Sequence, residues 1–581
     1  MTASREVRSL TAAPVAQSST ARIQLFLASL LLTAAILVWA HQLGPTHALT
    51  PIFYVLFRFF DYTAGMVSVL LLIAALAIPS GAWPHTLLRW LGRHPGRVAA
   101  ATGLLLCIGT LVVYRNHPLA MDEYAPYFQS QVFAAGRLAG QFPPALLDWL
   151  VPPPFQDFFL NVSHATGAVA SAYWPSFALL LTPFTRLGIP WACNPCVSAL
   201  TLLAIHRLAL CLFKDQESAG LAVLLTLASP VFFANGISYY SMPAHLLANA
   251  VYALLLLEPT PRKALVAGVV GSVALTLHNP VPHTLFALPW IVYLAMRPER
   301  VRLLGALAAG YLPLCLLLGV GWFAFSADLV RQGGGAAAGA HLGAMLNSAF
   351  GRPTGTVALA RLIGVAKIWL WAVPGLLLLA AVGAWKWRRD PRCLLLVGSA
   401  LATLVGYLFV PMDQGHGWGY RYFHSAWLAL PLLAAGALTR TQAGPAGTSA
   451  TALEADDVRT FVVACAVLTL LVGVGLRFFQ IHEFVVHEQG QVPAYAGSER
   501  RVVILDTTRS FYGQDLVQND PFLRGPLTRM LTRGADADAQ MMSRHFPDMR
   551  RVFADEHGTV WTAVAEPQAQ TRGSVSRPDS P

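Results

Sequence analysis

The stretch from residue 98 to residue 138 reads VAAATGLLLCIGTLVVYRNHPLAMDEYAPYFQSQVFAAGRL. Its first part, 98–115, is apolar and long enough to cross the hydrocarbon core of a membrane as a helix. Asp122 and Glu123 follow this run, and the apolar residues after them recur at helical spacing. Two adjacent carboxylates at the mouth of a membrane span are costly to hold near hydrocarbon. The pair therefore indicates a functional site at a membrane surface.

The composition of the whole chain supports a membrane location. The 581 residues are 55% hydrophobic and 12% charged, with a mean hydropathy of +0.53. A soluble protein carries about twice that charged fraction. The apolar runs are continuous rather than alternating, which excludes a membrane β-barrel. The net charge of +11 comes from Lys and Arg in short loops between spans, so it does not indicate nucleic acid as a partner.

Hydropathy predicts an all-α polytopic membrane protein with about thirteen transmembrane helices. We expect a disordered cytoplasmic N-terminus (1–21) and two N-terminal spans (22–97). The main transmembrane region (98–478), with a large outer loop (116–190), follows, and then an extracytoplasmic C-terminal extension (479–581). The predicted spans are 22–42, 51–78, 98–115, 191–213, 217–235, 244–258, 263–278, 284–296, 302–325, 361–387, 392–410, 422–438 and 459–478.

Basic residues set the expected orientation, since Lys and Arg gather on the cytoplasmic side. With the predicted spans, the basic loops all fall on one side of a cytoplasmic (inner) membrane, and the acidic pair faces outward. This orientation holds only if segment 173–187 does not cross the membrane. The segment is apolar but short and holds two prolines, so we expect it to be a juxtamembrane or re-entrant segment. The basic residues include Arg22, Arg89, Arg93, Arg97, Lys214, Arg262, Lys263, Arg297, Arg300, Lys386, Arg388 and Arg440.

Several local patterns lie outside the predicted spans. A strand is expected at 502–505 and a hairpin at 551–564, which together suggest a small α+β extension. Residues 333–338, GGGAAA, have the composition of a flexible linker. Asp61 lies beside Arg58 in the second span, where an intramembrane ion pair and simple helix packing are both open interpretations.

The acidic pair has two interpretations. A carboxylate could take the proton of an attacking hydroxyl, and the two acids together could hold a divalent cation through their oxygens. The alternative is a helix N-terminus carrying acids that oppose its dipole. Adjacent residues on a helix diverge by about 100°, so Asp122 and Glu123 share one site only if the turn there is not yet helical.

A glycine-spaced loop at another predicted outer helix end, residues 414–422 (QGHGWGYRY), offers a positive group. Glycines let the backbone approach a ligand closely, and Arg421 could hold a phosphate with two donors. Trp418 and Tyr420 could stack on a sugar, with Asp413 and His416 crowding the same loop. The alternative is an interfacial aromatic belt with an anchoring arginine.

Three further polar residues stand at a third predicted outer helix end. His278, Asn279 and His283 surround Pro280 there. A ligand-binding role and a histidine simply satisfied at the interface are both open.

The order of these motifs resembles that of the GT-C glycosyltransferases. The similarity is to the bacterial relatives of protein O-mannosyltransferases and aminoarabinose transferases, and it spans about 98–440. Its first part is Met121-Asp122-Glu123-Tyr124 with Gly136-Arg137-Leu138, its second Tyr173-Trp174-Pro175 before a leucine run, and its third His278-Asn279-Pro280 before Leu288-Pro289. The resemblance implies a GT-C-like fold with juxtamembrane helices in the first outer loop.

The resemblance also implies the reaction. Such enzymes move a sugar from a polyprenyl-phosphate donor to a glycan, lipid or protein acceptor on the outer face of the membrane. Asp122 would be the base and Glu123 its partner or a metal ligand. A divalent cation bound by these two acids is the one cofactor that the resemblance leaves open. Membrane lipid is a further expected partner. The remaining substrate-binding candidates are Arg137, Tyr173, His278, Asn279, His283, Asp413, His416, Trp418, Tyr420 and Arg421.

The chain departs from the family pattern at several positions. His278-Asn279-Pro280 stands where many relatives carry Arg-Pro. The turn at 238–243 lacks the second acid seen in some relatives, a place that Asp413 could take. The Tyr173 segment has no lysine, so the aminoarabinose substrate is not carried over.

Two other functions stay open from the sequence. A transporter or lipid flippase also needs many spans and buried polar groups, although no half-to-half repeat is visible. A non-catalytic partner in envelope-polysaccharide assembly is the second, and it would not need Asp122 for product formation.

Overall fold

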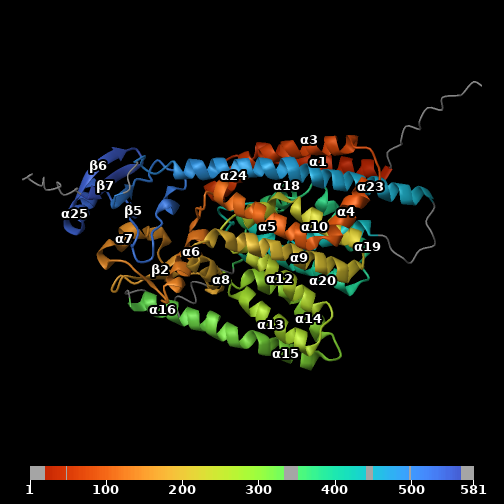
Figure 1. Cartoon of the computed structure of the whole chain (residues 1–581), viewed down its shortest axis with the longest axis horizontal. Helices are drawn as coiled ribbons and strands as arrows, with labels where there is room; N and C mark the ends of the chain where they lie inside the picture. The colour runs from red at the N-terminus through yellow and green to blue at the C-terminus, as the bar shows by residue number, and fades with distance from the viewer. Residues whose placement is uncertain (1–19, 48, 333–350, 440–448, 496–498, 564–581) are drawn as a thin grey trace, which may run out of the picture.

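The computed structural model of the chain is a bundle of long helices that lie side by side, with a small sheet at one end (Figure 1). It describes residues 20–47, 49–332, 351–439, 449–495 and 499–563. The predictions of a disordered N-terminus and of a linker at 333–338 fall almost entirely or wholly outside these ranges.

Seven helices in the described residues are long and apolar enough to cross a membrane, or eight if one bent pair is a single span. The chain is therefore a multi-pass membrane protein. The seven are Thr20–Gln42 (α1), Pro51–Ala77 (α2, Pro51–Val55, and α3, Tyr62–Ala77, through a π-helical turn), Pro95–Val112 (α5), Pro190–Phe213 (with α9, Cys193–Phe213), Arg300–Gln332 (α15, Arg300–Leu314, and α16, Trp322–Gln332), Pro391–Phe409 (with α20, Pro391–Gly406) and Ala455–Gln489 (within α23, Ser449–Leu468, and α24, Val474–Gln489).

Shorter helices complete the bundle, and their length explains why about thirteen spans are not confirmed. At 1.5 Å per residue, a helix of fifteen residues is shorter than the hydrocarbon core. Helices of this kind are α4 (Trp83–Arg93), α10 (Gln216–Leu227) with α11 (Pro230–Gly236) as the bent pair, α12 (Met242–Leu256), α13 (Pro261–Leu275), α14 (Val281–Ala295), α18 (Gly355–Leu370), α19 (Leu376–Lys386), α21 (Arg421–His424) and α22 (Ala429–Leu438).

The segment between α5 and α9 leaves the bundle. It begins with α6 (Met121–Ala134), continues through α7 (Leu147–Leu150) and ends with α8 (Ser176–Arg186), which packs on α6. Three short strands form an antiparallel sheet in the order β1-β3-β2: Gly140–Gln141, Ala168–Ser171 and Leu160–Val162. Segment 173–187 thus holds only an eleven-residue helix.

Residues 501–563 form a four-stranded sheet with one helix, α25 (Ala535–His545). The order is β5-β4-β7-β6, with β4 and β5 parallel and the other pairs antiparallel. One apolar core joins this sheet to α6, since Ile504 and Met530 cluster with Phe128 and Val132. The sheet therefore stands beside the acidic pair. The strands are β4 (Arg501–Leu505), β5 (Leu527–Leu531), β6 (Met549–Asp555) and β7 (Gly558–Ala563).

A buried ion cluster joins helices far apart in the sequence. Asp61 accepts from Lys367 Nζ at 2.5 Å and pairs with Arg477 Nη1 at 2.9 Å, and the indole of Trp371 donates to it at 2.6 Å. The interpretation of Asp61 as the partner of Arg58 is therefore wrong. Arg58 lies over the rings of Phe59 and Tyr62 instead, because its side chain points to the bundle surface.

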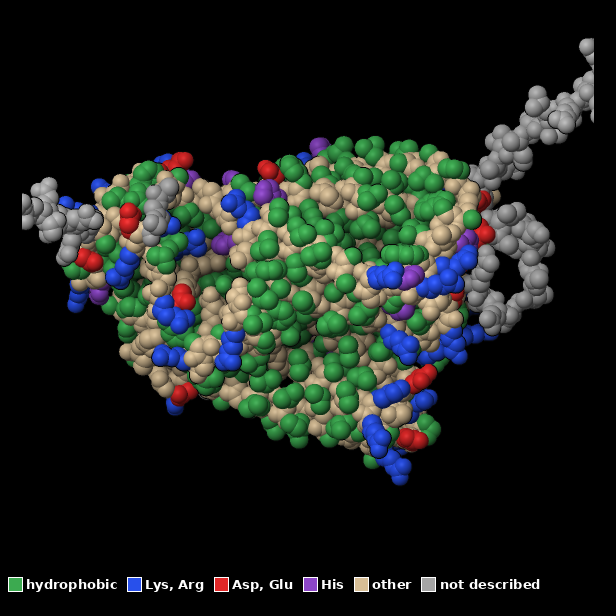
Figure 2. Space-filling model, in the orientation of Figure 1, with side chains coloured by type: hydrophobic (Ala, Val, Ile, Leu, Met, Phe, Trp, Pro, Cys, Tyr) green, Lys and Arg blue, Asp and Glu red, His purple; other side chains and the backbone are tan. Residues whose placement is uncertain are grey.

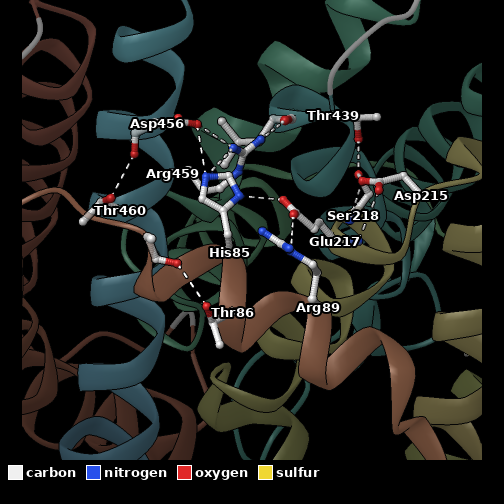
Figure 3. Close-up of polar contacts among 12 residues, drawn as sticks. His85, Thr86, Arg89, Asp215, Glu217, Ser218, Thr439, Asp456, Arg459 and Thr460 are labelled. Carbon is white, nitrogen blue, oxygen red and sulfur yellow. Dashed lines mark hydrogen bonds and ion pairs between the residues drawn. The ribbon is translucent and has the colours of Figure 1, made fainter.

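A second polar network lies where α4, α10 and α23 meet, at the end of the bundle opposite the sheet (Figures 1 and 3). His85 lies between two acids, with Nδ1 2.7 Å from Glu217 and Nε2 3.3 Å from Asp456. Arg89 pairs with Glu217 at 2.9 Å, and Arg459 pairs with Asp456 at 2.8 Å. Lys and Arg side chains gather at this same end, while the long flanks are apolar (Figure 2).

Candidate active site at the Asp122–Arg421 pair

Asp122 and Arg421 meet although 298 positions separate them in the sequence. Asp122 starts α6, and its carboxylate Oδ2 lies 3.0 Å from Arg421 Nη1 at the start of α21. The hydroxyl of Tyr173 donates to the other oxygen, Oδ1. The Asp122 side chain is 20% exposed and that of Arg421 6%. The candidate base Asp122 and the candidate phosphate-binding residue Arg421, which belong to two distant motifs, thus form one site.

The glycines of loop 414–420 allow this arrangement. Gly417 has a φ of +142°, a backbone conformation that residues with a Cβ rarely adopt. A Cβ on Gly417 would also lie 2.3 Å from Cδ of Arg421. The arginine folds back over its own loop, where Nη2 donates to the carbonyl of Gln414. Its guanidinium carbon lies 4.7 Å from the centre of the Tyr240 ring, so an aromatic face and a carbonyl hold the cation in place.

The charge state of Asp122 is set by its neighbours. Burial by itself would raise the pKa of Asp122, but the charge of Arg421 outweighs it. His278 and the Tyr173 hydroxyl act in the same direction, and the pKa falls below its ordinary value. Asp122 is therefore a carboxylate at neutral pH.

Glu123 turns away from Asp122 into the protein. It is fully buried, and three donors satisfy its oxygens: the Tyr114 hydroxyl at 2.9 Å, Leu119 N–H at 2.7 Å and Tyr239 N–H at 2.9 Å. Burial raises its pKa to about 7 against the effect of these donors. The two acids do not share one site, because α6 is helical from Met121 onward and sends adjacent side chains in different directions.

Tyr173 and His278 line the site beside Asp122. Their ring centres are 3.9 Å apart, and Trp174 N–H donates to the carbonyl of His278 at 3.2 Å. Burial lowers the pKa of His278 to about 4, despite the opposing charge of Asp122. His278 is therefore neutral in this environment.

Two neighbours of His278 have structural contacts instead. Asn279 accepts from the N–H of Val281 at the start of α14. His283 is enclosed, with Asn249 and Tyr311 each 2.7 Å from one of its ring nitrogens.

The other candidate residues of the glycine loop make hydrogen bonds that hold the loop against neighbouring elements. Asp413 accepts from the N–H and the hydroxyl of Thr50 at 2.7 and 2.8 Å, which ties the loop to the start of α2. Trp418 donates to the Tyr114 hydroxyl at 3.0 Å, and His416 Nδ1 lies 2.7 Å from the Tyr240 hydroxyl. Trp418, Tyr420 and His416 are all buried. Neither aromatic ring is on the surface, as stacking on a sugar would require.

Arg137 lies away from this site. It is exposed and stacks over Phe522, with 5.1 Å between its guanidinium carbon and the ring centre.

The C-terminal segment contributes residues that the sequence analysis missed. Tyr512 lies 5.7 Å from the His416 ring, and Asp515 accepts from Met121 N–H at 2.6 Å, one residue before Asp122. The Tyr124 hydroxyl and the backbone of Asn519 exchange hydrogen bonds of 2.6 and 2.8 Å. This segment covers the first turn of α6. No local pattern marks these residues, because they meet α6 across almost 400 positions.

Asp515 predicts a pH-dependent stability. Burial raises its pKa to about 8 from 3.8; the Met121 N–H opposes this shift, and the charges of Asp122 and Glu123 add to it. A carboxyl group whose pKa is raised in the folded state favours folding when it is protonated. The free energy of unfolding therefore falls as the pH rises from about 4 toward 8. We expect Asp515→Asn, which keeps the acceptor for Met121, to raise Tm at pH 8.5 and leave it unchanged at pH 3.5. Thermal unfolding in detergent measures this, with Asp520→Asn as the control; an equal rise at both pH values would contradict the prediction.

The two acids are not arranged as joint metal ligands. Among the residues that the structure describes, no three His, Cys, Asp or Glu side chains are arranged to hold a metal ion. Glu123 already accepts three hydrogen bonds and is not directed at Asp122, so the two acids do not form a joint pair of ligands.

Solved structures share the architecture built up above. The chain is similar to ArnT from Cupriavidus metallidurans bound to undecaprenyl phosphate, with 14% identity and a TM-score of 0.51 over 81% of this chain and 99% of that one. It is also similar to the apo state of the same protein, with 15% identity and a TM-score of 0.52 over 81% and 98%. The chain has an ArnT-like fold. The resemblance to GT-C glycosyltransferases seen in the sequence is thus confirmed at the level of the fold. Protein-family models and curated proteins give no match to the sequence.

Proposed function

We propose that this protein is a membrane glycosyltransferase that takes a sugar from a polyprenyl-phosphate donor. The Asp122–Arg421 pair carries the proposal, since it sets a carboxylate and a buried guanidinium 3.0 Å apart beside the membrane bundle. The ArnT-like fold supports it, and one of the similar ArnT structures is bound to undecaprenyl phosphate. The acceptor is a hydroxyl group of a glycan, lipid or protein.

In this proposal Arg421 receives the phosphate of the donor. Its Nη groups hold Asp122 and Gln414, and its Nε has no hydrogen-bond partner among the described residues. A guanidinium can hold phosphate with two parallel hydrogen bonds and stabilise the leaving group as charge develops on it. The hydroxyl of the acceptor attacks the anomeric carbon, the bond from that carbon to the phosphate oxygen breaks, and polyprenyl phosphate leaves.

Asp122 takes the proton from the attacking hydroxyl. As a salt-bridge partner it is a weak base, because Arg421 holds its pKa down. A phosphate that binds Arg421 competes with Asp122 for the guanidinium, so the pKa of Asp122 rises toward its ordinary value when the donor arrives. The base thereby becomes stronger only in the loaded site.

The proposed site faces outward from a cytoplasmic (inner) membrane. Basic side chains gather at the end of the bundle opposite the sheet and α6, and others stand at the sheet end (Figure 2). Those opposite the sheet lie near the ends of the bundle helices, where the positive-inside rule applies, and this favours that end as cytoplasmic. The four-stranded sheet then lies outside the membrane, above the site. Some of the short helices would cross as well, covered by their neighbours.

Binding of the lipid tests the proposal directly. We expect the purified protein to bind undecaprenyl phosphate but not undecaprenol, and Arg421→Gln to weaken that binding about tenfold or more, as for loss of a charge-assisted pair. Arg137→Gln changes an exposed arginine that stacks on Phe522 away from the site, so it serves as the control and should bind normally. Equal binding of undecaprenyl phosphate and undecaprenol by the wild type would contradict the proposal.

A further inference from the structure

One face of α12 carries polar side chains toward two other helices. Ser241, at the N-cap position of the helix, is followed at intervals of four residues by His245 and Asn249, so the three side chains share this face. Asn249 shows where the face points. Its amide donates to the carbonyl of Ser425 at 2.9 Å, at the end of α21, and its oxygen lies 2.7 Å from His283 on α14. The face therefore looks into the wedge between α21 and α14.

Nearer the start of α12, the polar atoms of this wedge have no partner. Both ring nitrogens of His245 and the hydroxyl of Ser241 lack a hydrogen bond within the described residues, as do His424 Nδ1 and the Ser425 hydroxyl. His245 and His424 are each 1% exposed. A buried polar atom without a partner costs about 1–3 kcal/mol. Several such atoms on neighbouring elements leave hydrogen-bonding capacity that no described residue uses.

The wedge is continuous with the proposed active site. His245 lies within electrostatic reach of His278 and His424, and His278, whose Nδ1 also lacks a partner in the described chain, stacks on Tyr173. Tyr173 donates to Oδ1 of Asp122, whereas Arg421 binds Oδ2. Tyr173, on which His278 stacks, and Arg421 thus contact different oxygens of the Asp122 carboxylate.

The chemistry of these groups selects the ligand. Burial lowers the pKa of His424 to about 3 and that of His278 to about 4, so both rings are uncharged. A neutral imidazole donates at one nitrogen and accepts at the other. Such groups fit hydroxyls, which also do both, better than a phosphate or an ammonium group.

We propose that Ser241, His245 and His424 form, with His278, a subsite for the hydroxyl groups of a sugar ring. The proposal rests on the proposed function and adds to it the place of the sugar: phosphate at Arg421, ring among the histidines, Asp122 between them. The ring belongs either to the donor or to a glycan acceptor, and both offer the same hydroxyls.

Two lipid probes test the subsite: undecaprenyl phosphate and the same lipid phosphate carrying mannose, glucose or arabinose. We expect the wild type to bind one sugar-linked form more tightly than the bare phosphate, and His245→Phe to lose about tenfold of that preference while it binds bare undecaprenyl phosphate normally. His245→Gln, which can still donate and accept, should keep part of the preference. His487→Phe, at an exposed position on α24, is the matched control.

Each other outcome is decisive. If His245→Phe binds the sugar-linked lipids normally but raises the KM for a glycan acceptor about tenfold, the ring in the subsite is that of the acceptor. If both lipids and the acceptor are unaffected, or both lipids weaken equally, the subsite is overturned and buried water satisfies the imidazoles. Failure of the wild type to bind any of these lipids would overturn both the proposed function and the subsite. If the wild type binds bare undecaprenyl phosphate normally but shows no preference for a sugar-linked form and no effect of His245→Phe, only the subsite is overturned.

Discussion

Asp122→Asn is expected to lower sugar transfer about 10²- to 10⁴-fold, the usual contribution of a positioned general base. The amide keeps an oxygen for the Tyr173 hydroxyl, so the site should fold, but it cannot take a proton. The measurement is transfer from the sugar-linked undecaprenyl phosphate in proteoliposomes, at matched amounts of folded protein.

Binding of the donor separates a lost base from a damaged site. Without the negative charge, Arg421 loses its 3.0 Å ion-pair partner and is freer to hold phosphate. Asp122→Asn should therefore bind undecaprenyl phosphate as tightly as the wild type or more so. Asp148→Asn, a surface acid of the same outer loop that pairs with Arg533 at 2.8 Å, is the control and should transfer normally. Undiminished transfer by Asp122→Asn would remove Asp122 as the base.

The second large effect is expected at Asp61, in the membrane bundle. Asp61→Asn removes the one carboxylate that both Lys367 and Arg477 contact, at 2.5 and 2.9 Å. All three side chains are almost completely buried, and breaking a buried pair from one side costs about 3–5 kcal/mol because the remaining charge is uncompensated. We expect a drop in Tm of many degrees, measured by thermal unfolding in detergent.

Two further variants make this expectation specific. Arg58 lies one turn from Asp61, but Arg58→Gln loses an exposed 3.4 Å contact to His41 Nδ1 and the stacking on Phe59 and Tyr62. It should therefore change stability by less than about 1 kcal/mol. Asp61→Asn combined with Lys367→Met removes one of the stranded cations and should recover part of the loss. Similar Tm values for Asp61→Asn and Arg58→Gln would show that the cluster contributes little.

The local patterns in the sequence singled out many residues of the candidate site, but not their positions relative to one another. The acids at 122 and 123, the glycine loop with Arg421, and the segment with Tyr173 were all singled out from composition and spacing. Their assembly into one site was an inference from a resemblance. Local patterns could not separate Asp122 from Glu123, because neighbours in the chain have the same local surroundings. Only the direction of α6 against its neighbours sends one to Arg421 and the other to Tyr114.

The number of spans shows the limit of hydropathy. A window of apolar residues detects a long helix well, since each residue adds its transfer free energy independently. It cannot distinguish a short crossing helix from one buried by its neighbours. Several predicted spans, such as 244–258 and 284–296, correspond to fifteen-residue helices that packing covers on several sides.

By itself, the sequence determined that this is a multi-pass helical membrane protein with an acidic pair at a helix start and an arginine in a glycine loop. These are properties of composition and short-range spacing. The tertiary structure alone decided the partners: Asp61 with Lys367 and Arg477, Asp515 with the start of α6, and Asn249 with His283 and Ser425. The physical reason is that a buried charge or polar atom is stabilised by whichever group the fold brings within about 3 Å, and that distance in space is unrelated to distance along the chain.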